Sequence, residues 1–419
     1  MSSDRPDLIV VGAGVIGIAC AHYLSAAGLR VTVIDQGKLA SGCSYANCGY
    51  VCPSHVLPMT EPGAIGMAIK SLFNPRAPFR VKPRLSPALW NWMWQFARRC
   101  THRKMIDAGH HLKAILDSSM AEYRRLIAAE SLDCEWKQTG LLYVLRTAKG
   151  MRAFAESDHL LTEEFGVSAK RIEGDALPAF DPALRPGLAG AFHYEEDASV
   201  RPDLLNASWV GRLRARGVEF VENCRVTGVR KSDGRIVGLD TTCGPLSADQ
   251  YVFAAGAWSP KLAGELECRI PIEQGKGYSV TMSRPDPCPR VPMLFPEHRV
   301  AVSPFDTGYR LGSMMEFAGY DESIPPQRIQ QLRDSAEPYL MSAAPDGPAQ
   351  TWYGWRPMTW DSLPIIGRVP ALSNALLATG HNMLGLSLAT GTGRLIAEMA
   401  TGAATHIDAG AYSVARFGG

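Results

Sequence analysis

The chain has 419 residues, of which 46% are hydrophobic and 20% charged, and its formal net charge at pH 7 is +2. This length and composition suffice for a large buried core and predict two lobes, and they exclude long disordered tracts. The near balance of acidic and basic residues gives no reason to expect a nucleic-acid partner.

The cysteines and the first residues indicate the compartment. Ten cysteines are scattered along the chain without the density of a small disulfide scaffold, which predicts free thiols in a reducing environment. The opening MSSDRPD lacks the basic segment and apolar stretch of a secretory signal. No apolar run approaches the roughly 20 residues of a membrane span, so we expect a cytoplasmic protein that crosses no bilayer.

The segment from Asp7 to Asp35 predicts a strand–helix–strand unit. It reads DLIVVGAGVIGIACAHYLSAAGLRVTVID, with a buried strand from Leu8 to Val11, a glycine turn, a helix closed by Gly28 and a second strand. A G-x-G-x-x-G motif between strand and helix, followed by an acid after the second strand, indicates dinucleotide binding.

Each glycine of this motif has a separate role. Gly12 permits a tight turn, Gly14 lets the backbone approach a pyrophosphate, and Gly17 lets the helix pack closely against the strand. Asp35 follows the second strand, where its carboxylate is placed to accept hydrogen bonds from the adenosine ribose hydroxyls. A carboxylate there repels the 2′-phosphate of NADP, which leaves NAD or FAD.

The loop that follows, ASGCSYANCGYVCPSH at 40–55, contains three cysteines. Their spacing matches neither paired zinc ligands nor the common iron–sulfur motifs, so we expect no metal and keep a redox-active cysteine pair as the alternative. The small and polar residues predict instead a loop that offers hydroxyl, amide and backbone N–H groups to a flavin. They are Ser41, Ser44, Asn47 and Gly49.

Two later segments place small residues next to strands. The stretch 217–254 predicts alternating strands with a hairpin turn at Asp233-Gly234, followed by Ala255-Gly256, whose small side chains admit a cofactor. In the C-terminal part, a strand leads through glycines into a helix that begins near Leu386. The N-terminus of such a helix would stabilise negative charge on a reduced flavin.

These motifs resemble one flavoprotein superfamily. The Ser-x-x-Asn-x-Gly core of the loop, after the glycine motif, looks like the D-amino-acid dehydrogenase branch of the D-amino-acid oxidase, glycine oxidase and sarcosine oxidase superfamily. Further resemblance lies in YEEDASVRPDLL (194–205), DQYVFAAGAWSPKLA (249–263), WYGWRPMTWDSLPIIGR (352–368) and ALLATGHNMLGLSLATGTGRLIAEM (375–399). The likeness spans the chain in order and is weakest over 100–190 and 280–345, where substrate selectivity would reside.

The resemblance implies an α/β fold with a discontinuous Rossmann-like FAD-binding domain and a second, mixed antiparallel-sheet α+β substrate domain. We expect the FAD-binding domain to comprise residues 1–85, 190–270 and 350–419, and the substrate domain to comprise 86–189 and 271–349. Within the second domain, the alternation over 299–317 predicts antiparallel strands, and PPQRIQQLRDSAEPYL predicts a helix.

It also implies noncovalent FAD, because no cysteine occupies the C-terminal region where some relatives tether their flavin. Val226 matches the position at which the family's backbone meets the adenine, and Trp258 either contacts the cofactor or fills the core. The remaining expected cofactor contacts are Val15, Ile16, Gln36, Gly354, Gly380, Met383, Leu384 and Gly385.

Four residues are expected to meet the substrate. Arg356 matches the family's arginine that holds the substrate carboxylate through two parallel hydrogen bonds, the alternative being an ion pair at the surface or between lobes. Tyr278 in QGKGYSV matches a tyrosine that faces the pocket, with core packing as the alternative. His55 and His381 are candidate donors to substrate or flavin, with a structural role as the alternative. Met383 stands where glycine oxidases carry an arginine, which favours side chains larger than that of glycine.

The implied reaction is oxidation of a D-amino acid by hydride transfer from its α-carbon to flavin N5. Water then converts the imino acid to a 2-oxo acid and ammonia. Positioning carries most of such catalysis, so we name no acid or base. Two alternatives stay open: the flavin subunit of a dehydrogenase for cyclic imino acids such as D-hydroxyproline, and a noncatalytic electron-relay subunit. An NAD-linked dehydrogenase is disfavoured, because it would leave the flavin-facing loop without a purpose.

The segment 62–106 carries nine lysines or arginines and no acidic residue. Within it, SPALWNWMWQFARRC predicts a helix with Trp90, Met93, Trp94 and Ala97 on one face. Such a helix is suited to an anionic membrane surface, where a dehydrogenase would pass electrons to a quinone or a partner subunit. The alternative is that the tryptophans are buried against the flavin domain.

Overall fold

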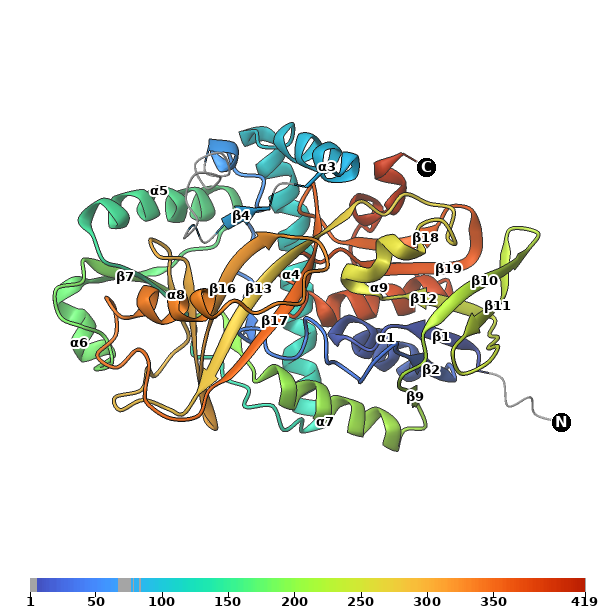
Figure 1. Cartoon of the computed structure of the whole chain (residues 1–419), viewed down its shortest axis with the longest axis horizontal. Helices are drawn as coiled ribbons and strands as arrows, with labels where there is room; N and C mark the ends of the chain where they lie inside the picture. Colours follow the sequence, from blue (N-terminus) through green and yellow to red (C-terminus); the bar gives the residue numbers. More distant parts are fainter. Residues whose placement is uncertain (1–5, 67–76, 78, 83, 419) are drawn as a thin grey trace.

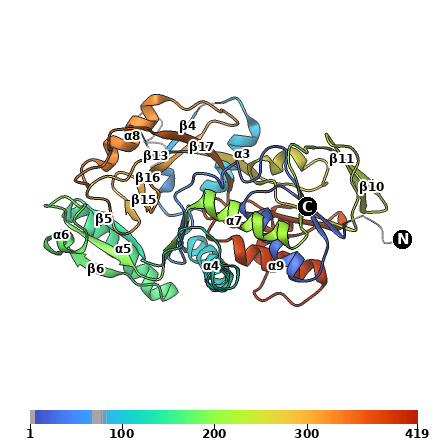
Figure 2. The same ribbon diagram turned by 90° about the horizontal axis from the view of Figure 1, so that it is seen from below.

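The computed structural model describes residues 6–66, 77, 79–82 and 84–418. These residues form two large β-sheets that lie side by side, with the long helix α4 (His102–Glu130) between the two parts of the molecule (Figure 1). Figure 2 shows α4 nearly end-on between α5 (Ala148–Phe165) on one side and α9 (Ala389–Thr401) on the other. The α/β class with a second, mixed sheet is confirmed.

The first sheet brings together strands from both ends of the chain. Within the described residues its order is β18-β19-β12-β1-β2-β9, and all neighbours are parallel except the antiparallel pair β18 and β19. Its strands are β1 (Leu8–Val11), β2 (Val31–Ile34), β9 (Glu219–Val221), β12 (Gln250–Phe253), β18 (Ile365–Val369) and β19 (Leu372–Thr379). Helix α1 (Val15–Ala26) connects β1 to β2, which confirms the predicted strand–helix–strand unit.

The register of the parallel strands determines where the glycine turn lies. Val11 pairs with Ile34 on one side and Phe253 on the other, so the three strands end at one edge. At that edge the Gly12 N–H donates to the Ile34 carbonyl at 2.8 Å, and the Ala254 N–H donates to the Val11 carbonyl at 2.8 Å. The carboxyl edge of a parallel sheet is where such folds bind nucleotides.

Helix α1 is held very close to the sheet and to α9. A side chain at Gly17 would place its Cβ 1.8 Å from the Gly12 carbonyl oxygen. On the opposite side, a Cβ at Gly393 of α9 would lie 2.6 Å from the Ala19 carbonyl oxygen. Both glycines therefore allow backbone-to-backbone approach that any side chain would prevent.

The second sheet is mostly antiparallel. In the described part of the chain its order is β17-β13-β16-β15-β14-β5-β7-β6, with β4 paired to β16. The strands are β4 (Phe79–Val81), β5 (Leu141–Leu145), β6 (Lys170–Glu173), β7 (Gly190–Tyr194), β13 (Ile272–Met282), β14 (Met293–Phe295), β15 (Val300–Phe305), β16 (Gly308–Phe317) and β17 (Gln350–Thr359). The strands expected over 299–317 are confirmed as β15 and β16.

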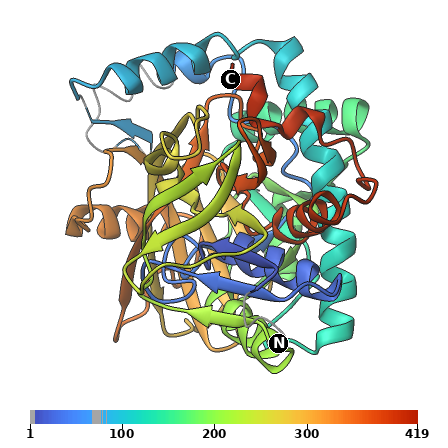
Figure 3. The same ribbon diagram turned by 90° about the vertical axis from the view of Figure 1, so that its right-hand side faces the viewer.

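Two short pairs complete the strands. The hairpin β10 (Val226–Ser232) and β11 (Arg235–Thr241) turns at Asp233 and Gly234, both with positive φ, which confirms the predicted turn (Figure 3). Strand β3 (Tyr50–Val51) pairs with β8 (Ala198–Ser199), so the cysteine loop is joined to the segment before α7.

The remaining helices cover the sheets. They are α3 (Pro87–Ala97), α6 (Leu177–Phe180), α7 (Pro202–Ala215) and α8 (Pro326–Ala336), with short 3₁₀ turns at Gly174–Ala176, Gly256–Leu262, Gly410–Tyr412 and Val414–Phe417. Helix α8 confirms the expected helix. The C-terminal helix α9 begins at Ala389, three residues after the predicted start, because a turn from Leu384 to Leu388 precedes it.

Three strands of the second sheet lie in ranges that the sequence analysis assigned to the FAD-binding domain. They are β4, β7 and β17. Pairing of strands defines sheets and not domain boundaries. The division of the chain into two discontinuous domains therefore stays a prediction.

The close approach at Gly17 predicts an unusual response to substitution. Alanine normally stabilises a helix interior relative to glycine, but Gly17→Ala should lower the free energy of unfolding by about 1–3 kcal/mol through overpacking. Gly211→Ala in α7, where a Cβ meets nothing within 4 Å, is the matched control and should raise it by about 0.5–1 kcal/mol. Denaturant unfolding of both variants checks this, and stabilisation by both would contradict the tight contact.

Candidate cofactor and substrate site

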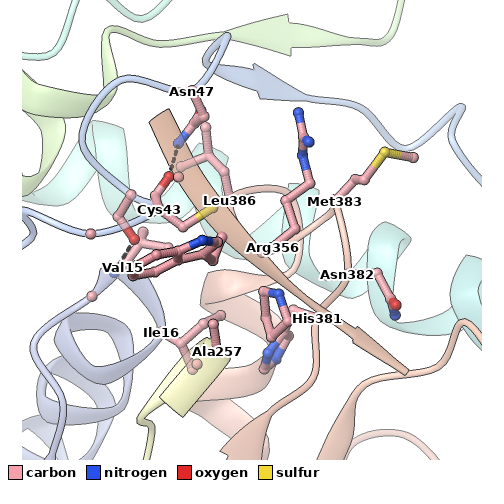
Figure 4. A pocket seen from close by; sticks show the side chains of 18 of the residues that line it. Val15, Ile16, Cys43, Asn47, Ala257, Arg356, His381, Asn382, Met383 and Leu386 are labelled. Carbon is pink, nitrogen blue, oxygen red and sulfur yellow. Dashed lines mark hydrogen bonds between the residues drawn. The ribbon is translucent and has the colours of Figure 1, made fainter. Parts of the chain in front are cut away.

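A continuous cavity of about 1150 Å³ opens at the carboxyl edge of the first sheet and extends along the second. All of the residues that the sequence assigned to cofactor or substrate line it, except Gly17 and Gly380. Figure 4 shows that its walls come from the start of α1, the cysteine loop, β17 and the loop before α9. Segments remote in sequence thus converge on one cavity, as predicted, whereas the individual roles of their residues stay predictions.

The glycine turn provides an anion-binding end. Gly14 is the N-cap of α1 and has no side chain to cap the helix, and the first turn contains no acid. Gly12 has φ +108°, and a Cβ there would lie 2.5 Å from the Ala254 carbonyl oxygen. A helix N-terminus without an acid, behind a turn of small residues, fits a pyrophosphate. These residues therefore fit the dinucleotide portion of FAD.

Asp35 lies at this end but also has a structural role. Its two carboxylate oxygens accept the N–H groups of Ala13 at 2.7 Å and of Gly37 at 2.8 Å. The carboxylate is thereby fixed against the glycine turn while it lines the cavity. The predicted contact with ribose hydroxyls uses the remaining acceptor capacity of these oxygens.

The cysteine loop is shaped by its own side chains. The Asn47 side chain accepts from the Gly49 N–H at 2.9 Å and donates to the Cys43 carbonyl at 3.2 Å, and the Ser41 hydroxyl donates to the Lys38 carbonyl. The Ser44 hydroxyl accepts the Val15 N–H at 2.9 Å. These polar groups first hold the loop against α1, a role the sequence did not indicate.

All ten cysteines lie in the described part of the chain and are free thiols. Cys43 and Cys48 line the cavity, and burial raises the pKa of both thiols although Arg356 opposes the shift. Cys52 is buried behind the loop, where its N–H donates to the Ser387 hydroxyl at 3.1 Å. The three thiols thus lie in different surroundings and remain protonated near neutral pH.

Arg356 extends from β17 into the cavity (Figure 4). Its Nη1 donates to the Met314 carbonyl at 2.7 Å. On the neighbouring strand β13, a Cβ at Gly277 would lie 2.3 Å from Nη1, so the absence of a side chain at Gly277 makes room for the guanidinium. Arg356 is partly accessible because it faces the cavity, although protein surrounds it.

No carboxylate neutralises Arg356. Among the described residues none lies within the 4.0 Å of its guanidinium that defines an ion pair, whereas the buried Arg310 and Arg328 have Asp203 at 3.8 Å and Glu316 at 3.4 Å. Removal from water lowers the pKa of Arg356. A guanidinium that is surrounded by protein and faces the cavity is suited to bind a carboxylate ligand.

Tyr278 lines the cavity but its hydroxyl is engaged elsewhere. The hydroxyl donates to Glu316 Oε2 at 2.6 Å, and the side chain is buried. Burial, followed by this hydrogen bond, raises the pKa of Tyr278. The ring rather than the hydroxyl is therefore presented to the cavity.

Both candidate histidines are neutral near pH 7. His55 Nε2 lies 2.5 Å from the Tyr143 hydroxyl, and His381 Nε2 lies 3.0 Å from Thr392 Oγ1. Burial lowers the pKa of His55 to about 4 and that of His381 to about 3. Neither contributes a positive charge for a substrate carboxylate, which leaves that function to Arg356.

A buried acid that the sequence did not single out supports the loop with His55. Asp197 is fully buried, and it accepts the Ser54 hydroxyl at 2.6 Å and the Ser54 N–H at 3.1 Å. It lies within the quoted segment YEEDASV, where nothing distinguished it from its exposed acidic neighbours Glu195 and Glu196. Burial raises its pKa from 3.8 to about 7.

The raised pKa of Asp197 predicts a pH-dependent stability. Between pH 3.8 and about 7 the folded protein keeps a proton that the unfolded chain releases, so the stability contributed by this group falls as pH rises through that range. Asp197→Asn cannot ionise; its amide oxygen can accept the Ser54 N–H, and its NH2 group can donate to the Ser54 hydroxyl in place of the second acceptor oxygen. The melting temperature of the wild type, relative to that of the variant, should therefore decline from about pH 5 to about pH 8.

The exposed substitution Asp346→Asn serves as the control for this experiment, and it should leave the pH dependence of the melting temperature as in the wild type. Parallel profiles for the wild type and Asp197→Asn would contradict the buried, protonated carboxyl.

Comparisons with known proteins agree with this geometry. The family model of the DAO, or FAD-dependent, oxidoreductases matches residues 7–399. The D-amino acid dehydrogenase of Neisseria meningitidis is 31% identical over 416 residues, covering 98% of this chain and 99% of that protein, and that of Agrobacterium fabrum is 30% identical over 417 residues, covering 98% and 99%.

Solved structures share the fold. Glycine oxidase from Geobacillus kaustophilus superposes with a TM-score of 0.77 at 22% identity, covering 98% of this chain and 99% of that one. L-proline dehydrogenase from P. horikoshii gives 0.74 at 19% identity, covering 99% and 98%. The superfamily expected from the motifs is confirmed: the chain belongs to the DAO family of FAD-dependent oxidoreductases.

Proposed function

We propose that this protein is an FAD-dependent D-amino-acid dehydrogenase that yields 2-oxo acids and passes its electrons to a quinone or a protein acceptor. The observation that carries the proposal is Arg356, a cation without a carboxylate partner among the described residues, in the cavity that begins at the glycine turn. Full-length relatives named D-amino acid dehydrogenase support the same substrate class.

The residues of the cavity perform positioning. FAD, when bound, accepts the two electrons and the α-hydrogen of the amino acid. Arg356 holds the substrate carboxylate with two N–H groups, which fixes the rotation of the α-carbon. His55 and His381, being neutral, add no positive charge that would repel a cationic amine. The surrounding protein limits access of water to the reacting carbon.

Arg356 provides the direct test. Hydrogen bonds to a charged group contribute about 1.5–3 kcal/mol each, so loss of two should lower kcat/KM for D-amino acids by at least about 100-fold. Arg356→Gln should show this loss while FAD remains bound, and Arg356→Lys should lose less because it keeps the charge without the planar fork. Anaerobic reduction of the flavin measures the reaction, and its absorbance measures the bound cofactor.

Arg368→Gln on β18 is the matched control, since Arg368 is exposed and does not line the cavity. Unchanged kinetics in Arg356→Gln would remove the substrate anchor. A flavin that is bleached by no D-amino acid, and by no cyclic imino acid, would support instead the electron-relay subunit.

Helix α3 supports a surface role in electron delivery. Trp90 and Trp94 are 56% and 55% exposed, whereas Trp92 on the opposite face is buried and donates to the Met358 carbonyl at 3.1 Å. Arg98 lies over the Trp94 ring at 4.6 Å. Exposed tryptophans beside cations are typical of helices that lie at a membrane interface.

The structure exposes only part of the helix face predicted from the sequence. Met93 and Ala97 are half-buried, so the exposed apolar side chains here are those of the two tryptophans and of the fully exposed Leu85. Residues 67–76, 78 and 83 of the predicted contact segment lie outside the described residues. Over the rest of the chain, no helix has the length and apolarity to span a bilayer. We therefore propose contact with one membrane surface through α3.

Vesicle binding tests this contact. The double variant Trp90→Ala/Trp94→Ala should lose most of its co-sedimentation with anionic phospholipid vesicles, because it lacks both interfacial rings and with them the contact between Trp94 and Arg98. Val237→Ala, a change of an apolar side chain that is 49% exposed elsewhere on the surface, is the control and should bind as the wild type does. Equal binding of all three proteins, or none by the wild type, would refute the contact.

A further inference from the structure

The end of the cavity away from the glycine turn has walls of a different character. Besides Arg356, the cavity is lined there by residues of the second sheet and of the helices that cover it. They are Leu112 of α4, Tyr143 of β5, Phe154 and Leu161 of α5, Tyr194 of β7 and Leu294 of β14. We call this end, defined by these six residues, the aromatic chamber. All of them except Tyr194 lie in the ranges 100–190 and 280–345, where the sequence resembles the family least.

The rings of the chamber form one packed wall. Tyr143 and Phe154 have ring centroids 4.9 Å apart, and Tyr143 and Tyr194 have theirs 5.4 Å apart in an edge-on arrangement. Such contacts fix the orientation of the rings. The chamber is therefore a preformed apolar surface.

The polar atoms of these side chains are already satisfied within the protein. The Tyr143 hydroxyl is paired with His55 Nε2, and the Tyr194 hydroxyl donates to Asp158 Oδ1 at 2.9 Å. His55 itself is neutral, since burial lowers its pKa to about 4. A ligand that enters the chamber thus meets carbon surface and no unpaired charge from these residues.

The charged residues that line the cavity are not among the six residues of the chamber; besides Arg356 they are Asp35, Glu61, Arg225, Lys261, Glu265 and Glu322. Asp35 and Glu265 accept backbone N–H groups at the glycine turn and β10, at the nucleotide end. On the loop that follows His55, the nearest acid in the sequence is Glu61, which lines the cavity; removal from water raises the pKa of its carboxyl, and the attraction of Arg299 opposes this shift. A charged substrate side chain that entered the chamber would lose its hydration and would gain no ion-pair partner from these six residues.

We propose that the aromatic chamber binds the substrate side chain and selects D-amino acids with aromatic or branched aliphatic side chains over small and charged ones. This inference rests on the proposed function, because Arg356 must hold the carboxylate for the side chain to reach the chamber. An apolar side chain gains by leaving water, and a methyl group leaves most of the chamber unfilled.

Substrate comparison is the first test. We expect kcat/KM for D-phenylalanine and D-leucine to exceed that for D-alanine by at least about 10-fold, the scale of discrimination that apolar pockets reach, and to exceed those for D-glutamate and D-lysine by more. The assay uses purified protein with bound FAD and an artificial electron acceptor. Equal or higher values for D-alanine or for either charged substrate would overturn the proposal.

A variant that fills the chamber is the second test. Ser157 of α5 lines the cavity, so Ser157→Phe should lower the ratio of kcat/KM for D-phenylalanine to that for D-alanine by about 10-fold or more. Because the two substrates are compared in one sample, incomplete folding does not alter this ratio. Ala153→Phe, at an exposed position of α5 outside the cavity, should leave the ratio unchanged. A ratio in Ser157→Phe equal to that of the wild type would overturn the proposal.

Binding without turnover separates this inference from the proposed function. 3-Phenylpropionate should perturb the flavin absorbance with a Kd at least about 10-fold below that of propionate, and Ser157→Phe should abolish the difference. If these ligands behave so but no D-amino acid reduces the flavin, the proposed function fails and the chamber stands. If D-amino acids reduce the flavin but the two ligands bind equally, the chamber fails and the function stands.

Discussion

The site depends on one electrostatic constraint, a guanidinium that protein surrounds and that no carboxylate of the described residues neutralises. Holding such a charge away from bulk water is unfavourable, and Arg356 offsets this through the Met314 carbonyl and its opening to the cavity. Space for it exists because Gly277, on the adjacent strand, has no side chain. Two adjacent strands, and not one residue alone, therefore create the cationic position that we propose for the substrate carboxylate.

The rest of the fold brings the cofactor to that cation. Parallel pairing of β1, β2 and β12 ends three strands at one edge, and the glycine turn, Asp35 and Ala254 follow there. The second sheet presents Arg356 from β17 across the same cavity. A reactive centre that needs both a pyrophosphate cradle and a carboxylate anchor is therefore formed only where the two sheets meet.

Features of the fold that depend on short stretches of sequence could be predicted. The strand–helix–strand unit, the Asp233-Gly234 hairpin and the convergence of small residues on one cavity follow from alternation, turn chemistry and motif spacing. The sequence did not indicate that the Tyr278 hydroxyl is engaged by Glu316, because that contact depends on the register of β13 against β16. Asp197 and the ring of Tyr143 were missed for a similar reason, since burial by distant segments leaves no periodic signal.

The order of strands in the first sheet has a consequence for biosynthesis. Strand β19, formed by residues 372–379, pairs with β12, and α9 then packs closely on α1 through Gly393. A nascent chain that has emerged only as far as β17 therefore exposes the edge of β12 and an uncovered face of α1, both prone to association with other chains. The first sheet therefore reaches its full width, and α1 its cover, only after residues 372–401 have emerged from the ribosome.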